Sequence, residues 1–185
     1  MRAILIFLLP WYHSLVRDIY LPVPAENKTP IEWVNPIGIQ EMQRRDIMQW
    51  DWEVSIVLEN YPESYRMLIL GIIAQESQGL EQECQQWRDE VCGVGLMAIT
   101  PREWTGTVEE LSDPLYNIYT GAWMLDGAMK RAIEYGFRPG RDATRAALAA
   151  FNCGFTSLLA NKCASFGGFV YADVILNYWI PLLNG

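Results

Sequence analysis

The middle of the chain contains an apolar run that predicts one buried helix. No charged residue occurs in residues 67–74, so apolar side chains would cover most of the helix circumference. Pro62 suits a first helical position, and Gln78 is followed by Gly79, the residue type that commonly succeeds a helix C-terminus. The run is too short to cross a bilayer. The pattern therefore predicts a core helix over residues 61–77.

Apolar positions at helical spacing predict further helices on both sides of this run. Residues 37–60 are expected to form one helix, whose buried stripe would be Ile47, Trp50, Val54, Val57 and Leu58. Other helices are expected at residues 117–135, at residues 143–152, and from the Gly167–Gly168 break to about residue 184. No long strand-rich segment occurs, although residues 78–99 have room for a short hairpin. The fold class predicted is mainly α.

The first 36 residues differ in character from the rest. Arg2 and the apolar residues 3–9 resemble the start of a signal peptide, but Pro10 interrupts the run and only a weak cleavage site follows near Ala25. The alternative is a segment that packs on the domain. Prolines in residues 21–36 indicate an extended arm. We therefore expect an apolar segment and arm at 1–36, followed by one domain at 37–185.

Composition narrows the possible partners. A chain of 185 residues that is 51% hydrophobic and 19% charged suits one domain with a sizeable core. Its formal net charge of −8 disfavours nucleic acid and anionic membrane surfaces as partners, and no stable membrane span is expected. Eight Trp and nine Tyr can either fill the core or stack on ligand rings such as sugars.

Glu76 is the strongest candidate for a catalytic residue, because it lies at the end of the predicted apolar helix. A glutamate in water ionises near pH 4 and is a poor proton donor at neutral pH. Desolvation disfavours the charged form and raises the pKa, which keeps a carboxyl group ready to protonate a leaving group. The alternative is a solvated carboxylate at a helix end, which is the commoner situation for an isolated glutamate.

Several short motifs support the catalytic interpretation when they are taken together in order. They are Glu76-Ser77, Gly95-Leu96-Met97, Asp113-Pro114 with Asn117-Ile118 and Gly121-Ala122, the stretch 147–154, and Tyr171. Their order resembles the catalytic domain of soluble lytic transglycosylases and goose-type lysozymes. The resemblance covers about residues 61–179. It implies a lysozyme-like helical fold and a muramidase that cleaves the β-1,4 bond between N-acetylmuramic acid and N-acetylglucosamine in peptidoglycan glycan strands, with Glu76 as the catalytic acid.

The resemblance also assigns substrate contacts. It implies a groove wall at Gly95, Leu96 and Met97, a contact from Asn152 to an acetamido group, and a Tyr171 hydroxyl that orients Glu76 or stabilises charge. Ordinary packing is the alternative for residues 95–97, and by residue type alone Asn152 and Tyr171 would be structural. Ser77 would bond near Glu76, or it would only cap the helix. The chain departs from the family pattern at Ala98, where glutamine is usual, and at Phe151, where tyrosine is usual.

Asp89 is a second candidate carboxylate. Inverting glycosidases pair a general acid with a base that activates water. Goose-type lysozymes resemble this chain around Trp87 and Asp89, whereas transglycosylases usually carry serine at the Asp89 position. A second goose-type aspartate would fall at Thr100 and is missing. Asp89 is therefore either a water-positioning base or a loop carboxylate without a catalytic role.

The four cysteines form two local pairs, Cys84 with Cys92 and Cys153 with Cys163. Sequence allows three pairings, and we favour these two local disulfides, which would suit a periplasmic, secreted or virion setting. The alternative is four reduced thiols in the cytosol. The only histidine, His13, is far from the cysteines, so neither a metal site nor a cofactor is expected.

Three functions follow from these observations. A lytic transglycosylase is preferred. A goose-type hydrolase that uses Asp89 is the close alternative, and a catalytically silent wall-binding or virion structural protein belongs to a different class.

Overall fold

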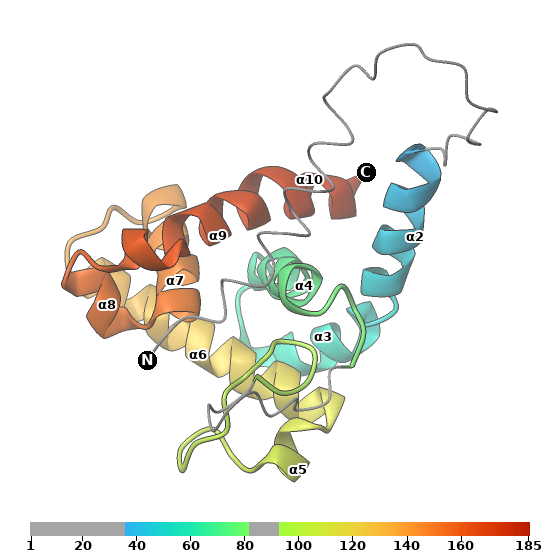
Figure 1. The fold of residues 1–185 in the computed structure, drawn as a ribbon, viewed down its shortest axis with the longest axis horizontal. Helices are drawn as coiled ribbons and strands as arrows, with labels where there is room; N and C mark the ends of the chain where they lie inside the picture. The colour runs from blue at the N-terminus through green and yellow to red at the C-terminus, as the bar shows by residue number, and fades with distance from the viewer. Residues whose placement is uncertain (1–35, 82–92) are drawn as a thin grey trace, which may run out of the picture.

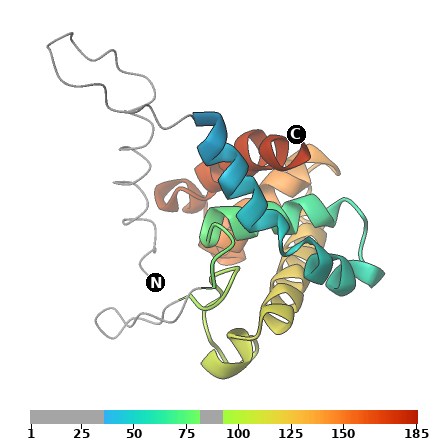
Figure 2. The same cartoon turned by 90° about the vertical axis from the view of Figure 1, so that its right-hand side faces the viewer.

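A computed structural model describes residues 36–81 and 93–185, and this part of the chain is mostly helical. Figure 1 shows the helices gathered around α4, and Figure 2 shows the same arrangement from the side. The elements, in chain order, are α2 (Pro36–Met48), α3 (Asp51–Val57), η2 (Leu58–Asn60), α4 (Tyr65–Glu76), α5 (Val108–Leu111), α6 (Pro114–Glu134), α7 (Arg141–Cys153), α8 (Phe155–Leu159), η3 (Cys163–Phe166), α9 (Gly168–Val174), η4 (Ile175–Trp179) and α10 (Ile180–Asn184).

Helix α4 is the centre of the core, as its uncharged sequence predicts. Every residue from Leu68 to Ala74 is buried, and α2, α3, α6, η4 and α10 all pack against the helix. The helix begins later than expected: Pro62 lies in the preceding turn, and the first helical residue is Tyr65. The predicted C-terminal end is confirmed, because α4 stops at Glu76 and Gly79 takes a left-handed conformation with φ of +80°.

The single helix expected at residues 37–60 is wrong, because the chain breaks after Met48. Helix α2 ends there, and α3 starts at Asp51. The Trp50 indole Nε1 donates a 2.7 Å hydrogen bond to the Gly79 carbonyl, which fixes the break against the turn that follows α4. The predicted stripe is nevertheless found on the inner side, with Ile47, Val54 and Leu58 buried. The break lets two short helices cover α4 where one straight helix would diverge from it.

Helices α6 and α7 form the second half of the core. The Asp113 side chain accepts a 2.8 Å hydrogen bond from the Tyr116 amide and so caps α6, with Pro114 at the first helical position. Residues 146–150 are all buried, and the four alanines among them let α7 lie close to α6 and α9. These two helices confirm the predictions at residues 117–135 and 143–152.

The last predicted helix consists of three consecutive pieces. Between α9 and α10 the five residues of η4 are π-helical, and η4 packs on α4. The contact is close because Gly71 of α4 has no side chain: a Cβ there would lie 2.8 Å from a methyl carbon of Ile175. The π turn thereby places Trp179 beside Gln75, whose Oε1 accepts a 2.9 Å bond from the indole Nε1.

The fold class prediction is confirmed. In the described ranges β-structure is limited to two isolated antiparallel bridges, Val94 with Ile99 and Arg102 with Gly106. Among the same residues no helix combines the length and the apolar character needed to cross a membrane.

Candidate active site

Glu76 is the last residue of α4, and the chain around it is tightly fixed. Ser77 follows as the helix cap, and its hydroxyl donates to the Ile73 carbonyl at 3.0 Å and accepts from the Gly79 amide at 3.2 Å. These bonds match the capping role that the sequence leaves open for Ser77. A contact between Ser77 and substrate stays a prediction.

Two further contacts hold the end of α4 from opposite sides. Gly79 lies against the backbone of Asp46 so closely that a Cβ would overlap the carbonyl, and its own carbonyl accepts the bond from Trp50. On the other side Gln75 is bonded to Trp179. Because the chain is anchored on both sides of Glu76, its carboxyl group has little freedom to leave the rim of the core.

Tyr171 of α9 is the residue that faces this carboxyl group. Its hydroxyl oxygen is fully buried and makes no hydrogen bond of good geometry to any residue in the described ranges. It does interact electrostatically with Glu76: burial, the charge of Glu76 and its acceptor oxygens raise the pKa of the tyrosine hydroxyl well above the ordinary value. The two groups therefore face each other at close range.

Burial of the carboxyl group sets the protonation of Glu76. Although part of the residue remains accessible, desolvation raises the pKa of Glu76 from 4.5 to about 7, and the Tyr171 hydroxyl opposes the shift by favouring the charged form. The group is thus close to half protonated at neutral pH. A carboxyl group in this state can donate a proton and can also accept one, which an ordinary solvated glutamate cannot do efficiently.

Asn152 lies near the end of α7, on a segment fixed by a disulfide. The predicted Cys153–Cys163 bond is confirmed, and it ties the end of α7 to η3. Gly168, the first residue of α9, packs directly on the Cys163 sulfur. The disulfide therefore connects the helix that carries Asn152 to the helix that carries Tyr171.

The Asn152 side chain also has an unused acceptor. Its Oδ1 is buried and has no hydrogen-bond partner in the described part of the chain. A buried polar atom without a partner costs about 1–3 kcal/mol, and such atoms in native proteins call for a specific explanation, such as a bound group. An amide N–H is one ligand group that would satisfy it.

The turn at residues 94–99 is held by Asn117, a fully buried residue of α6. Its Oδ1 accepts from the Met97 amide, and its Nδ2 donates to the carbonyls of Val94 and Leu111, all at 2.9 Å. The sequence analysis includes Asn117 in a family motif but predicts no role for it. The available signal was a lone asparagine inside an apolar helix face, which needs internal partners because a buried amide is costly to leave unbonded.

The residues predicted as a groove wall have a packing role in the structure. Leu96 and Met97 are fully buried, with Met97 packed on Gly121, so their side chains belong to the core. Gly95 has φ of +71°, and a Cβ there would collide with the Asn117 amide. Glycine is therefore required for the approach of Asn117. Between Val94 and Ile99 only Ala98 is more than slightly exposed, and a substrate contact from this turn stays a prediction.

Three predicted residues lie outside the described ranges. They are the candidate base Asp89 and the cysteines Cys84 and Cys92. Their roles stay predictions. Within the ranges that are described, no group of three or more His, Cys, Asp or Glu residues is arranged to hold a metal ion.

Comparison with known proteins decides the family. The family model described as the transglycosylase SLT domain matches residues 53–166, which is more than half of the chain. The chain belongs to the transglycosylase SLT domain family. The match spans α4, the Asn117 turn and α7 of this domain, and it supports peptidoglycan lytic transglycosylase-type activity at the level of the family. Neither a curated protein nor a solved structure matches the chain significantly.

Proposed function

We propose that this protein is a peptidoglycan lytic transglycosylase that cleaves the β-1,4 bond between N-acetylmuramic acid and N-acetylglucosamine, with Glu76 as general acid and then general base. The supporting observation is the carboxyl group on the last turn of a buried helix, with a pKa raised to about 7 and the Tyr171 hydroxyl opposite it. Membership of the SLT family supports the substrate class.

The reaction uses one carboxyl group twice. Protonated Glu76 donates to the glycosidic oxygen, the bond from that oxygen to C1 of the muramic acid breaks, and positive charge develops at C1. The Glu76 carboxylate then takes the proton of the sugar's own 6-hydroxyl group, and O6 bonds to C1 to close a 1,6-anhydro ring. No water is consumed, and Glu76 ends the cycle protonated. A pKa near neutrality suits both steps.

Tyr171 and Asn152 would assist this step in different ways. The Tyr171 hydroxyl can donate to the Glu76 carboxylate once the proton has left, which stabilises the intermediate charge state. Asn152 Oδ1 can accept from the N–H of an acetamido group, which would satisfy its buried oxygen and orient the sugar. Both roles follow from groups whose hydrogen-bonding capacity is not used in good geometry within the described chain.

The raised pKa predicts the alkaline limb of the pH profile. Cleavage requires the protonated acid, so kcat/KM for peptidoglycan should be high below the pKa of Glu76 and fall about tenfold per pH unit above about 7. The measurement is initial-rate clearing of purified sacculi between about pH 5 and pH 9 at constant ionic strength. A rate that stays level across the alkaline half of that range would contradict the assignment of Glu76 as the acid.

Mass spectrometry of the soluble products tests the proposed chemistry. Digested sacculi should yield muropeptides with 1,6-anhydromuramic ends, each lighter than the hydrolysed product by the mass of one water, because water is not added. Reducing ends would instead indicate the goose-type hydrolase with Asp89 as base. No product at all would indicate a silent wall-binding or virion structural protein.

The site of action follows from the substrate. SLT-domain proteins act on peptidoglycan outside the cytoplasm, and the Cys153–Cys163 disulfide suits an oxidising compartment. We infer that this protein acts outside the cytoplasm, as a periplasmic, a secreted or a virion-associated protein. The apolar segment and arm expected at 1–36 lie outside the described residues, and the division at residue 37 stays a prediction.

A further inference from the structure

A cavity of about 620 Å³ lies at the opposite end of α4 from Glu76. Its lining is Val57, Asn60, Tyr61, Pro62, Tyr119, Asp126 and Lys130. The Tyr65 hydroxyl at the start of α4 donates to Asp126 at 3.2 Å, and Glu76 follows Tyr65 by eleven residues, or about 16 Å along the helix. The cavity is therefore separate from the candidate active site, and its volume is in the usual range for small-ligand pockets.

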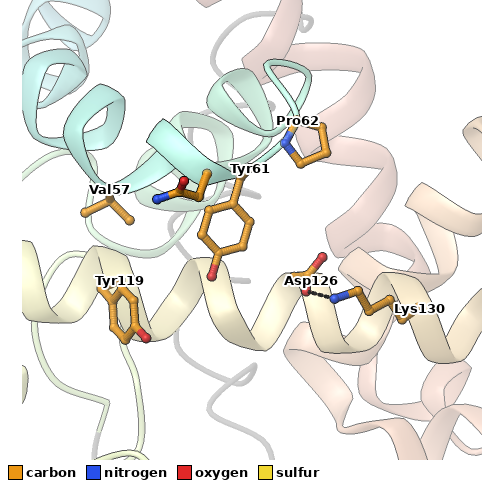
Figure 3. A pocket seen from close by; sticks show the side chains of 7 residues that line it. Val57, Tyr61, Pro62, Tyr119, Asp126 and Lys130 are labelled. Carbon is orange, nitrogen blue, oxygen red and sulfur yellow. Dashed lines mark ion pairs between the residues drawn. The ribbon is translucent and has the colours of Figure 1, made fainter.

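The carboxylate of this cavity has two contacts within the protein. Asp126 accepts the bond from Tyr65 and pairs with Lys130 at 2.6 Å, while further acceptor positions on its oxygens remain. The Tyr61 ring projects from the turn before α4 towards α6, between Tyr119 and Asp126, as Figure 3 shows. Burial and the neighbouring Tyr119 and Asp126 raise the pKa of the Tyr61 hydroxyl. This agrees with the position of all three residues in the lining of the same cavity.

An aromatic stripe on α6 continues the cavity. Its residues are Tyr116, Tyr119, Trp123, Asp126 and Lys130, which share one helix face because they are spaced by three or four positions. The three aromatic rings are substantially exposed, and Trp104 packs beside Trp123 with 5.9 Å between ring centroids. From Tyr116 to Lys130 the stripe is about 21 Å long, enough for several sugar rings in a row.

This combination favours a saccharide over a protein partner. Sugar rings present C–H faces that stack on aromatic rings and hydroxyl groups that bond to carboxylate, amide and ammonium groups. The cavity offers both kinds of group side by side. The buried centre of a protein–protein interface, in contrast, is depleted in Asp and Lys, and here the Asp126–Lys130 pair lines the concave part.

We propose that the cavity and the α6 stripe form a second saccharide-binding site, which holds a glycan strand of N-acetylated hexosamines away from Glu76. The identity of that strand as peptidoglycan rests on the proposed function. A second contact on the same polymer raises the effective concentration of glycosidic bonds at the active site. The enzyme would then act more efficiently on whole sacculi than on short fragments.

The test uses binding in a background that cannot cleave. Full-length Glu76→Gln protein is sedimented with purified sacculi, alone and with Tyr119→Ala or Tyr135→Ala added. Tyr119 and Tyr135 are both exposed tyrosines near or on α6, but Tyr135 is outside the cavity and the stripe. We expect Tyr119→Ala to weaken binding about tenfold, the effect of losing one ring contact, and Tyr135→Ala to leave it within about twofold.

Cleavage kinetics in protein that retains Glu76 separate this site from the active site. With Tyr119→Ala alone, kcat/KM on sacculi should fall, while kcat/KM on a soluble tetrasaccharide of two GlcNAc–MurNAc units, which contains one cleavable bond and is too short to reach both sites, should stay unchanged. If neither substrate is cleaved by the parent protein, the proposed function fails while the binding result still stands. Equal sacculus binding by the Tyr119 and Tyr135 variants would overturn the second site. So would a Tyr119→Ala change in oligomeric state with unchanged sacculus binding, because the face would then be a protein interface.

Discussion

Glu76→Gln is expected to lower the rate of peptidoglycan cleavage by about a thousandfold or more. Glutamine has nearly the same shape but cannot give a proton to the glycosidic oxygen. Removal of a general acid lowers the rate by about two to four orders of magnitude, and the loss is larger when the same group also acts as the base. The measurement is the initial rate of release of soluble muropeptides, quantified by liquid chromatography. Glu63→Gln is the matched control, since Glu63 lies exposed before the same helix, and its activity should stay within about twofold.

Stability measurements show whether the loss is chemical. In the folded protein the pKa of Glu76 is raised from 4.5 to about 7, so its contribution to stability is fully present below pH 4.5 and is lost as pH rises through about 7. Above that pH the folded parent must carry a buried charge, whereas the glutamine of the variant stays neutral. At about pH 8 the variant should therefore be more stable than the parent, by about 2 to 3 kcal/mol in urea unfolding. A variant that is inactive and also less stable than the parent at this pH would contradict the assignment.

Asn117→Ala is expected to destabilise the fold by about 4 kcal/mol. The change removes three hydrogen bonds of 2.9 Å and leaves the Met97 amide and the carbonyls of Val94 and Leu111 without this partner in a buried place. Each buried group that loses its partner costs about 1–3 kcal/mol. A domain of ordinary stability has only about 5–15 kcal/mol in total, so the loss would be large. Urea unfolding followed by circular dichroism measures it.

A second measurement on the folded fraction of Asn117→Ala separates positioning from proton transfer. We expect kcat to fall at least about tenfold because the 94–99 turn loses its anchor, while the midpoint of the pH profile stays at about 7 because the environment of Glu76 is unchanged. Asn184→Ala is the control, since Asn184 is exposed and bonds to the Ile180 carbonyl within its own helix. It should cost less than about 0.5 kcal/mol. Equal stability of the two variants would show that the Asn117 bonds do not hold the turn.

The helices near the core could be predicted because their evidence is local. The uncharged run at residues 67–74 predicts a helix buried in the protein core. The capping residue Asp113, followed by Pro114, marks the start of α6 within one turn. The break after Met48 could not be predicted in this way. It depends on the Trp50 bond to Gly79, a residue 29 positions further along the chain.

Local sequence features indicate candidate residues for the site but not their geometry. Glu76 is marked by its position at the end of an apolar helix, and the Cys153–Cys163 pair by its short spacing. The need for a glycine at Gly95 could not be predicted from the sequence. It arises because a side chain there would collide with the amide of Asn117, which belongs to α6. Likewise, nothing local indicates that Tyr61 and Tyr119 line one cavity.

Local patterns in the chain are enough to predict a helical domain with one carboxyl group at the end of its most apolar helix, because hydrophobic periodicity and helix-ending residues act over a few positions. The protonation behaviour of that group depends on the packing of the whole fold. The pKa of about 7 comes from the desolvation of Glu76 by packed helices, and it is moderated by Tyr171, which lies far away along the chain. Burial and electrostatic interaction depend on distance in space, and the fold alone sets those distances.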